Sequence, residues 1–114
     1  MSEERTVFQR IIAGELPCDK VFENERIIAF KDIAPVAPVH LLVVSKKVYP
    51  SLQHIPAAEL SILAEMMGVV QKLAVEYKVQ DGYRCITNIG PDSGQEVRHL
   101  HFHVIGGRRL GALA

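Results

Sequence analysis

The residues from His99 to Ile105 begin with a strict alternation of imidazole and apolar side chains. This alternation predicts a β-strand, because side chains two residues apart on a strand project from the same face. His99, His101 and His103 therefore share one face, and the apolar residues between them face a core. Three imidazoles on one face need polar partners, and they concentrate the side chain that titrates nearest neutrality. The run thus indicates proton transfer, nucleophilic attack, metal binding or anion binding.

The residues alone leave three interpretations of this run open. The histidines could face solvent on an exposed sheet, although such ordered spacing disfavours that interpretation. They could bind zinc, because strand histidines two residues apart can chelate it; yet the run contains no Cys, Asp or Glu, and the nearest acid, Glu96, precedes it. The third interpretation is a nucleophilic histidine whose neighbouring imidazoles bind phosphate.

The composition indicates one globular domain, 1–114, without a strongly charged partner. The 114 residues can bury one core, 48% of them are hydrophobic, and thirteen basic residues balance thirteen acidic ones. This balance predicts neither nucleic-acid binding nor membrane binding. Cys18 and Cys85 are far apart, and the sequence has no signal-like start and no apolar run of membrane length. We therefore expect a cytoplasmic protein in a reducing compartment.

Hydrophobic periodicity and turn residues predict an α+β fold with a largely antiparallel sheet, one long helix and a short N-terminal helix. Thr6 and Gln9 suit the start of the short helix and Gly14 suits its end. Pro56 suits the first turn of the long helix. We expect helices over 6–13 and 56–79, strands over 20–23, 26–31, 40–45, 83–89 and the histidine run, and loops over 32–38 and 90–94.

The predicted long helix carries two rows of apolar side chains, although packing on one sheet needs a single stripe. The first row is Leu60, Leu63, Met67, Val70, Ala74 and Tyr77, and the second is Ile62, Met66, Val69 and Leu73. The second row favours a homodimer in which the same helix of another copy covers it. One broad face packed on a single core explains the pattern equally well.

Several segments outside the histidine run resemble one family when they are taken together with it. They are Phe8–Ile12, Glu15–Pro17, Phe30–His40, Asn88, Gly94–Val97 and Gly106–Arg108. With the motif His-φ-His-φ-His-φ-φ, where φ is apolar, they make the chain similar to the histidine-triad nucleotide-binding proteins, specifically the Hint branch. The resemblance covers nearly the whole chain. It implies a HIT-like fold whose sheet continues across a homodimer.

The resemblance implies hydrolysis of purine nucleoside 5′-phosphoramidates, such as adenosine 5′-monophosphoramidate, to nucleoside monophosphate and amine through a nucleotidyl-histidine intermediate. It implies no cofactor and no metal ion. The chemistry is sound for imidazole, because a ring whose Nδ1–H is held by a carbonyl has a free Nε2 for attack on phosphorus. Dinucleoside polyphosphates are the alternative substrate class. A nucleotide-binding regulatory role with incidental turnover is the alternative function.

The resemblance also assigns roles by position. His101 is the expected nucleophile, and His99 and His40 are expected to support it. His103 and the backbone of Gly94, Gln95 and Glu96 are expected to hold the phosphate, with Asn88 on the phosphate or leaving-group side. Asp32 is expected to accept hydrogen bonds from the ribose hydroxyls, with Ile33 beside it. The expected base pocket consists of Phe8, Ile11, Leu16, Phe30 and Leu42.

Purely structural explanations also suit some of these residues. Phe8 and Phe30 also suit a core, Asp32 also suits a turn, and His40 also suits a satisfied structural position. Two departures from the family pattern matter as well. Glu96 stands where some members have Ser, so its backbone N–H is the safer phosphate contact. The chain stops at Ala114, where some members have a longer aromatic tail.

Overall fold

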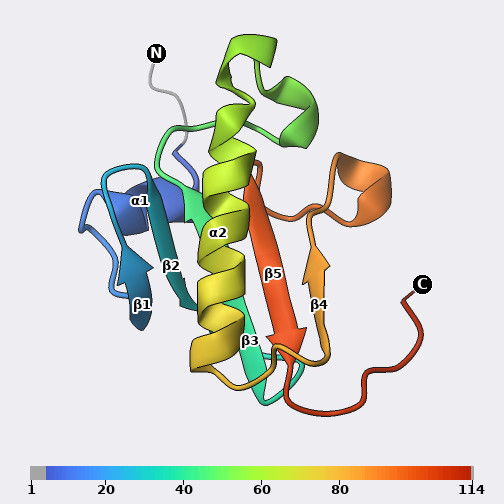
Figure 1. Ribbon diagram of the computed structural model, residues 1–114. Helices are drawn as coiled ribbons and strands as arrows, with labels where there is room; N and C mark the ends of the chain where they lie inside the picture. The colour runs from blue at the N-terminus through green and yellow to red at the C-terminus, as the bar shows by residue number, and fades with distance from the viewer. Residues whose placement is uncertain (1–4, 114) are drawn as a thin grey trace.

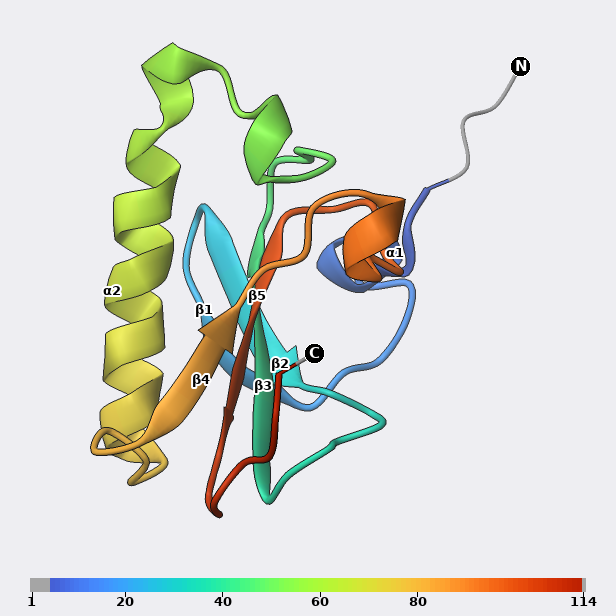
Figure 2. The same cartoon turned by 90° about the vertical axis from the view of Figure 1, so that its right-hand side faces the viewer.

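One antiparallel sheet separates a long helix from a short one in the computed structural model, which describes residues 5–113. Figure 2 shows α2 (Ser61–Glu76) along one face of the sheet and α1 (Val7–Ile12) on the other side. The strands, also shown in Figure 1, are β1 (Lys20–Glu23), β2 (Ile27–Lys31), β3 (Val39–Ser45), β4 (Tyr83–Ile86) and β5 (His101–Gly106). Their order across the sheet is β1-β2-β3-β5-β4. The predicted α+β architecture is confirmed.

The short helix α1 begins and ends as the sequence predicts. The Thr6 hydroxyl oxygen accepts a hydrogen bond from the Gln9 amide at 3.1 Å, and the Gln9 side chain accepts one from the Thr6 amide at 2.8 Å. This reciprocal cap satisfies two amides that lack helical partners. Gly14 follows with φ +77°, a left-handed conformation that glycine adopts without a Cβ clash. The cap fixes α1, and with it Phe8, against the sheet.

The central strands β3 and β5 pair so that their side chains divide cleanly between the two faces. Leu42 lies opposite His103 and Val44 lies opposite His101. Leu41 and Val43 point to the opposite face of the sheet and pack under α2 in the larger core. The buried members of this core are Ile27, Ala29, Leu41, Val43, Tyr49, Ile55, Ile62, Met66, Val69, Val70, Leu73, Leu100 and Val104. A smaller core lies under α1 and contains Phe8, Ile28, Phe30, Leu42 and Val44.

The long helix is shorter than the predicted range 56–79. Pro56 is extended, a 3₁₀ turn follows over Ala57–Glu59, and α2 runs only from Ser61 to Glu76. Lys78 then takes a φ of 60°, which ends the helical path. Within residues 5–113, no helix has the length and apolar character needed to span a membrane.

Two strand boundaries also differ from the prediction. β4 ends at Ile86 rather than Ile89, and β5 begins at His101 rather than His99. Just past the end of β4, the Thr87 hydroxyl donates a hydrogen bond to the His101 carbonyl at 2.7 Å, so a side chain and not a backbone amide contacts β5 there. Side-chain alternation cannot show where such ladder pairing stops, because alternating residues can continue past the last paired one.

The second apolar row of α2, for which a second subunit was expected, is buried within this one chain, whereas the first row is buried only at Val70 and Ala74. Met66 and Leu73 of one row are 0% exposed, and Val70 and Ala74 of the other are 2% exposed. The sheet therefore covers a broad helical face, which is the alternative to the dimer explanation of this pattern. The two rows do not by themselves require a second subunit.

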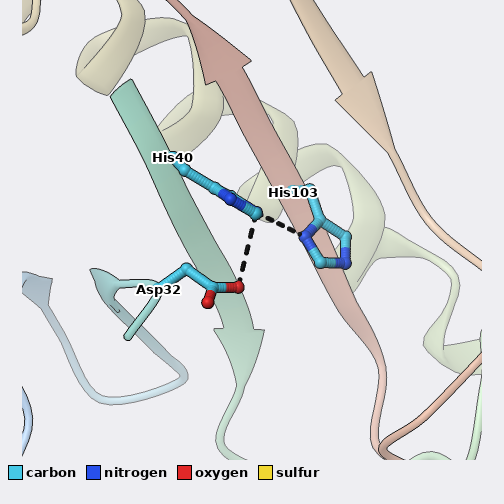
Figure 3. Close-up of side chains that lie close together, drawn as sticks. All are labelled: Asp32, His40 and His103. Carbon is cyan, nitrogen blue, oxygen red and sulfur yellow. Dashed lines mark hydrogen bonds and ion pairs between the residues drawn. The ribbon is translucent and has the colours of Figure 1, made fainter. Parts of the chain in front are cut away.

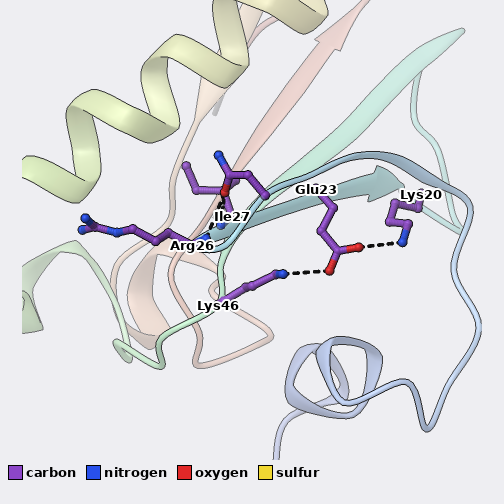
Figure 4. A network of polar contacts seen from close by, with 6 residues as sticks. Lys20, Glu23, Arg26, Ile27 and Lys46 are labelled. Carbon is purple, nitrogen blue, oxygen red and sulfur yellow. Dashed lines mark hydrogen bonds and ion pairs between the residues drawn. The ribbon is translucent and has the colours of Figure 1, made fainter.

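The β1–β2 hairpin is held by polar contacts on the surface (Figure 4). The Asn24 side chain accepts hydrogen bonds from the amides of Arg26 and Ile27 at 2.9 and 2.8 Å, which shapes the turn. Glu23 contacts Lys20 at 2.6 Å and Lys46 at 2.7 Å. The hydrogen bond from Lys20, with one from Lys46, lowers the pKa of Glu23 to about 2.

Candidate active site

The predicted row of imidazoles lies on the sheet face that α1 covers. The Phe8 ring meets the rings of His99 and His101 edge to face at centroid distances of 5.8 and 4.9 Å, and the His101 and His103 rings lie 5.1 Å apart. Leu100 packs on the opposite side in the larger core. His99 therefore keeps the alternation of the run although it precedes β5. Fully exposed histidines are excluded, because His99 and His101 are both buried.

His99 is a fully buried ring with a fixed partner. Its Nε2 lies 2.5 Å from the Ser45 carbonyl oxygen, which can only accept, so Nε2 carries the proton. The Thr6 hydroxyl lies 3.4 Å from Nδ1. Burial lowers the pKa of His99, because the charged imidazolium is poorly solvated there. His99 thus connects the end of β3, the start of α1 and the entry to β5.

His101 has the ring arrangement that nucleophilic attack requires. Its Nδ1 lies 2.6 Å from the His99 carbonyl oxygen, so Nδ1 donates its proton to that oxygen. Burial lowers the pKa of His101 and favours the neutral ring. A neutral imidazole carries one ring proton. With that proton on Nδ1, Nε2 has a free lone pair.

His40 and His103 come from neighbouring strands and meet beside the loop that follows β2 (Figure 3). His40 Nε2 lies 2.9 Å from His103 Nδ1 and 3.4 Å from an Asp32 carboxylate oxygen. The other Asp32 oxygen accepts the Ala34 amide at 2.8 Å. Burial, with His101 and His40 nearby, lowers the pKa of His103 to about 4. At neutral pH this ring is uncharged.

Asp32, His40 and His103 are the described residues that could hold a metal ion, since one ligand atom from each lies within 4.8 Å of the others. The Val36 amide argues against this use, because it donates to His40 Nδ1 at 3.2 Å. A neutral His40 then has its proton on Nε2, the atom that a metal would need. The residues therefore fit a metal ion poorly, and the absence of a catalytic metal stays a prediction.

The predicted base pocket is divided between buried and accessible residues. Phe8, Phe30 and Leu42 are buried together in the smaller core, with Ile11 packed against them. Leu16 is exposed, and Ile33, which was expected beside Asp32 and not in the base pocket, is 99% exposed. Of the three buried side chains, Phe8 contacts the His99 and His101 rings, and Phe30 packs against Phe8. Among the predicted base-pocket residues, Leu16 is therefore the one that is exposed.

The predicted phosphate loop holds itself together through Gln95. This side chain donates to the carbonyls of Pro50 and Val97 at 2.7 and 3.1 Å and accepts the Gly90 amide at 2.8 Å. The amides of Gly94 and Gln95 donate within the loop, at 3.0 and 3.4 Å. Among the described residues, no backbone carbonyl accepts the Glu96 amide.

The Glu96 amide is therefore the one of the three loop amides without a partner of this kind. The expected phosphate contact of the Glu96 backbone stays a prediction. Asn88 follows β4 and is half-buried. It lies between Thr87, which binds the His101 carbonyl, and the 3₁₀ turn Pro91–Ser93 of the loop.

The comparison with known proteins agrees with this geometry. A model of the HIT domain matches residues 13–110 of the chain. The chain belongs to the HIT family. Its fold matches that of a histidine triad protein from Clostridium difficile, with a TM-score of 0.92 and 44% sequence identity over 100% of both chains.

Two curated relatives extend this family assignment. A HIT-like protein of Chlamydia pneumoniae is 53% identical to this HIT protein over 109 residues, which cover 96% of this chain and 99% of the relative. The purine nucleoside phosphoramidase of Escherichia coli K12 is 39% identical over 111 residues, which cover 96% of this chain and 93% of the relative.

The sequence did not identify the backbone groups that orient the imidazoles of this HIT protein. These are the carbonyls of Ser45 and His99 and the amide of Val36. Every non-proline residue carries the same two backbone groups, so no residue type marks these three. The alternation of the histidines could predict that each ring needs a partner. It could not predict which partner, and therefore which tautomer.

Proposed function

We propose that this HIT protein is a nucleotide hydrolase that cleaves purine nucleoside 5′-phosphoramidates to nucleoside monophosphate and amine. The observation that carries the proposal is the neutral His101 ring, whose Nδ1 proton is held by the His99 carbonyl so that Nε2 keeps its lone pair. The name and 39% identity of the Escherichia coli phosphoramidase support the choice of substrate.

In the first step, His101 Nε2 attacks the α-phosphorus and forms a nitrogen–phosphorus bond. The bond from phosphorus to the substrate amine breaks, and the amine leaves as a neutral molecule after its nitrogen has taken a proton from water. The ring becomes a nucleotidyl-imidazolium with its Nδ1–H still directed at the His99 carbonyl. That hydrogen bond is strengthened when the ring gains positive charge.

In the second step, water attacks the same phosphorus and the bond to His101 Nε2 breaks. The water oxygen becomes a phosphate oxygen of the nucleoside monophosphate. One of its two protons passes to solvent, which restores the proton that the amine took up in the first step, and the other stays on the phosphate. Both steps spread charge over the nonbridging phosphate oxygens, so fixed hydrogen-bond donors accelerate them. The Glu96 amide and a ring N–H of His103 are the donors that we assign to this role.

Asp32 is the group that we assign to the ribose. One of its oxygens is used by the Ala34 amide, which holds the carboxylate in place at the start of the exposed loop. The other oxygen faces His40 and can also accept from a hydroxyl. We assign the purine to the apolar surface above the buried Phe8–Phe30 pair, whose rings meet edge to face at 5.6 Å.

A turnover panel tests this proposal. It compares adenosine and guanosine 5′-phosphoramidates, their 2′-deoxy forms, and a dinucleoside polyphosphate, each with the wild-type protein and with Asp32→Ala. We expect the highest kcat/KM with the ribonucleoside phosphoramidates, and a smaller preference over the 2′-deoxy forms in Asp32→Ala. Faster cleavage of the polyphosphate would select the other substrate class. Binding without turnover of any of them would contradict the enzyme assignment.

We also propose that the protein is a homodimer. The sheet order leaves β4 at an edge with Cys85 exposed on it, and free strand edges favour pairing with another chain. On α2, Leu63 and Met67 are only half-buried. Light scattering should give twice the monomer mass, and Met67→Glu should lower it without unfolding. A monomeric wild type at micromolar concentrations would contradict the dimer. Met66 is unsuitable for this test, because it lies in the core.

A further inference from the structure

A chain of hydrogen bonds runs from the loop after β2 to the phosphate-side histidine. The Val36 amide donates to His40 Nδ1 at 3.2 Å, and His40 Nε2 lies 2.9 Å from His103 Nδ1. An amide N–H can only donate, so neutral His40 has its proton on Nε2. That proton can bridge the two rings only if His103 Nδ1 is unprotonated. Neutral His103 then carries its own proton on Nε2.

We propose that His40 is a positioning residue that holds His103 in the Nε2–H tautomer, so that His103 presents a hydrogen-bond donor at the end of the ring away from His40. The assignment of that donor to a phosphate oxygen rests on the proposed function. The tautomer itself does not rest on it, because it follows from the backbone amide and the distance between the rings. The low pKa of His103, about 4, keeps the ring neutral at working pH.

The series of hydrogen bonds begins at Val36, and contacts outside the imidazole row hold this part of the loop after β2. Arg108, just after β5, donates from its guanidinium to the Val36 carbonyl at 2.9 Å. Gly107 lies so close to the same loop that a Cβ there would be 3.0 Å from Pro38. The prolines of the loop restrict its backbone further. These contacts hold the loop at Val36, and an amide N–H can only donate, so the direction of the hydrogen bonds from Val36 to His103 is set.

Asp32 is a second acceptor for the same proton. Its oxygen lies 3.4 Å from His40 Nε2, while His103 Nδ1 lies at 2.9 Å, so the free protein favours the bond to His103. A ribose hydroxyl that donates to Asp32 reduces the competition further. In that state His40 donates only to His103. The ribose hydroxyls then contribute to kcat as well as to binding.

The direct test is a long-range proton–nitrogen correlation spectrum of the uniformly ¹⁵N-labelled free protein at pH 7, where each neutral histidine reveals which ring nitrogen carries the proton. The signals are assigned with single His→Gln variants. We expect His103 and His40 as Nε2–H tautomers and His101 as the Nδ1–H tautomer. An Nδ1–H tautomer of His103 in the wild-type spectrum would overturn the proposal without any need for a variant.

Two substitutions at His40 separate positioning from packing. His40→Gln can donate through its amide to His103 Nδ1, whereas His40→Leu fills the site without a donor. We expect a single His103 tautomer in His40→Gln and mixed or inverted tautomers in His40→Leu. Kinetically, kcat should fall about tenfold in His40→Leu with little change in KM, and His40→Gln should recover most of it. An unchanged His103 tautomer in a folded His40→Leu protein would contradict the proposal.

The spectrum tests the positioning role of His40 and the kinetics test the proposed function, so each can be contradicted without the other. A His103 Nε2–H tautomer in a protein that turns over no phosphoramidate leaves the positioning role intact and removes the proposed function. The opposite tautomer in an active phosphoramidase removes the positioning role alone. His54→Leu is the matched control, since His54 is exposed and its ring contacts the Ser51 hydroxyl, outside this chain of bonds. It should change neither the tautomers nor kcat.

Discussion

One residue of the imidazole face and one of the β1–β2 hairpin have pKa values lowered by a similar amount, for opposite reasons. In His103, burial lowers the pKa from 6.5 to about 4 by disfavouring the charged ring. In Glu23, hydrogen bonds from Lys20 and then Lys46 lower it from 4.5 to about 2 by favouring the charged carboxylate. One site removes charge from the protein interior, and the other keeps charge at a surface where solvent and salt screen it.

The difference shows which polar contacts the molecule depends on. Among the described residues, no buried side-chain nitrogen or oxygen lacks a hydrogen-bond partner. The rings lose solvent and gain hydrogen-bond partners that fix their tautomers: backbone groups for His40, His99 and His101, and the His40 ring for His103. Losing one partner leaves a buried polar atom unsatisfied. The hairpin ions can turn to water when a partner is lost. We expect substitutions in the two regions to differ in effect by orders of magnitude.

The largest expected effect is the loss of turnover in His101→Ala. The substitution removes the nucleophile, so kcat should fall by several orders of magnitude while the nucleoside monophosphate still binds. Phosphoramidate turnover and calorimetric titration with the monophosphate measure the two properties. Glu23→Gln at the hairpin is the control and should keep nearly full turnover. Near-normal turnover in His101→Ala would exclude His101 as the nucleophile.

The second prediction concerns Phe8, which packs against the imidazole rings. Phe8→Ala removes the ring that packs edge to face with His99 and His101, and it should lower the free energy of unfolding by about 3 kcal/mol. That is the lower end for a buried Phe, because the short helix α1 can partly close the space. Urea denaturation measures it. A loss below about 1 kcal/mol would show that α1 adds little to the fold.

The third prediction separates the two regions by pH. Because the folded pKa of His103 lies below the unfolded value, unfolded chains bind the proton first as the pH falls. The contribution of His103 to the free energy of unfolding is complete above pH 6.5 and declines as the pH falls from 6.5 toward 4. His103→Gln should remove part of this decline in urea denaturation between pH 7 and 4, and the rest belongs to His99 and His101, whose pKa values burial also lowers. A wild type that loses stability only below pH 4.5 would mean that carboxylates such as Glu23 dominate instead.

The smallest expected effect is that of Glu23→Gln on stability. Its ion pairs are exposed, so salt should weaken them and their loss should be hard to separate from experimental error. The lowered pKa of Glu23 places its contribution above pH 4.5, with a loss as the pH falls toward 2. Thermal unfolding at low and high salt measures it. A large, salt-independent loss would mean that this network behaves like a buried one.

Much of the fold could be predicted from local patterns in the sequence. Alternation predicted the imidazole face, and Thr6, Gln9 and Gly14 predicted α1 from its two ends. The ends of α2 and β4 could not be predicted, because the chain leaves both through turns whose geometry depends on tertiary contacts. The two apolar rows of α2 were ambiguous, since a broad sheet and a second subunit bury the same residues.

The candidate site was predicted at the level of residue types and not of protons. The motif placed His101 and His103 on one face, and the resemblance added Asp32 and His40 from a distant segment. The proton positions depend on backbone groups at Val36, Ser45 and His99. Those groups have no signature in a sequence, because their direction is a property of the folded backbone.

The pairing of β3 with β5 also has a consequence for how the protein folds. His40 and His103 are 63 positions apart in the chain, so their contact closes a long loop, whereas the β1–β2 hairpin closes a short one. Loop closure of this length costs entropy before any contact compensates for it. We therefore expect the hairpin to form early and the imidazole face to assemble late. During synthesis on the ribosome, a nascent chain cannot gain activity until its last strand has emerged.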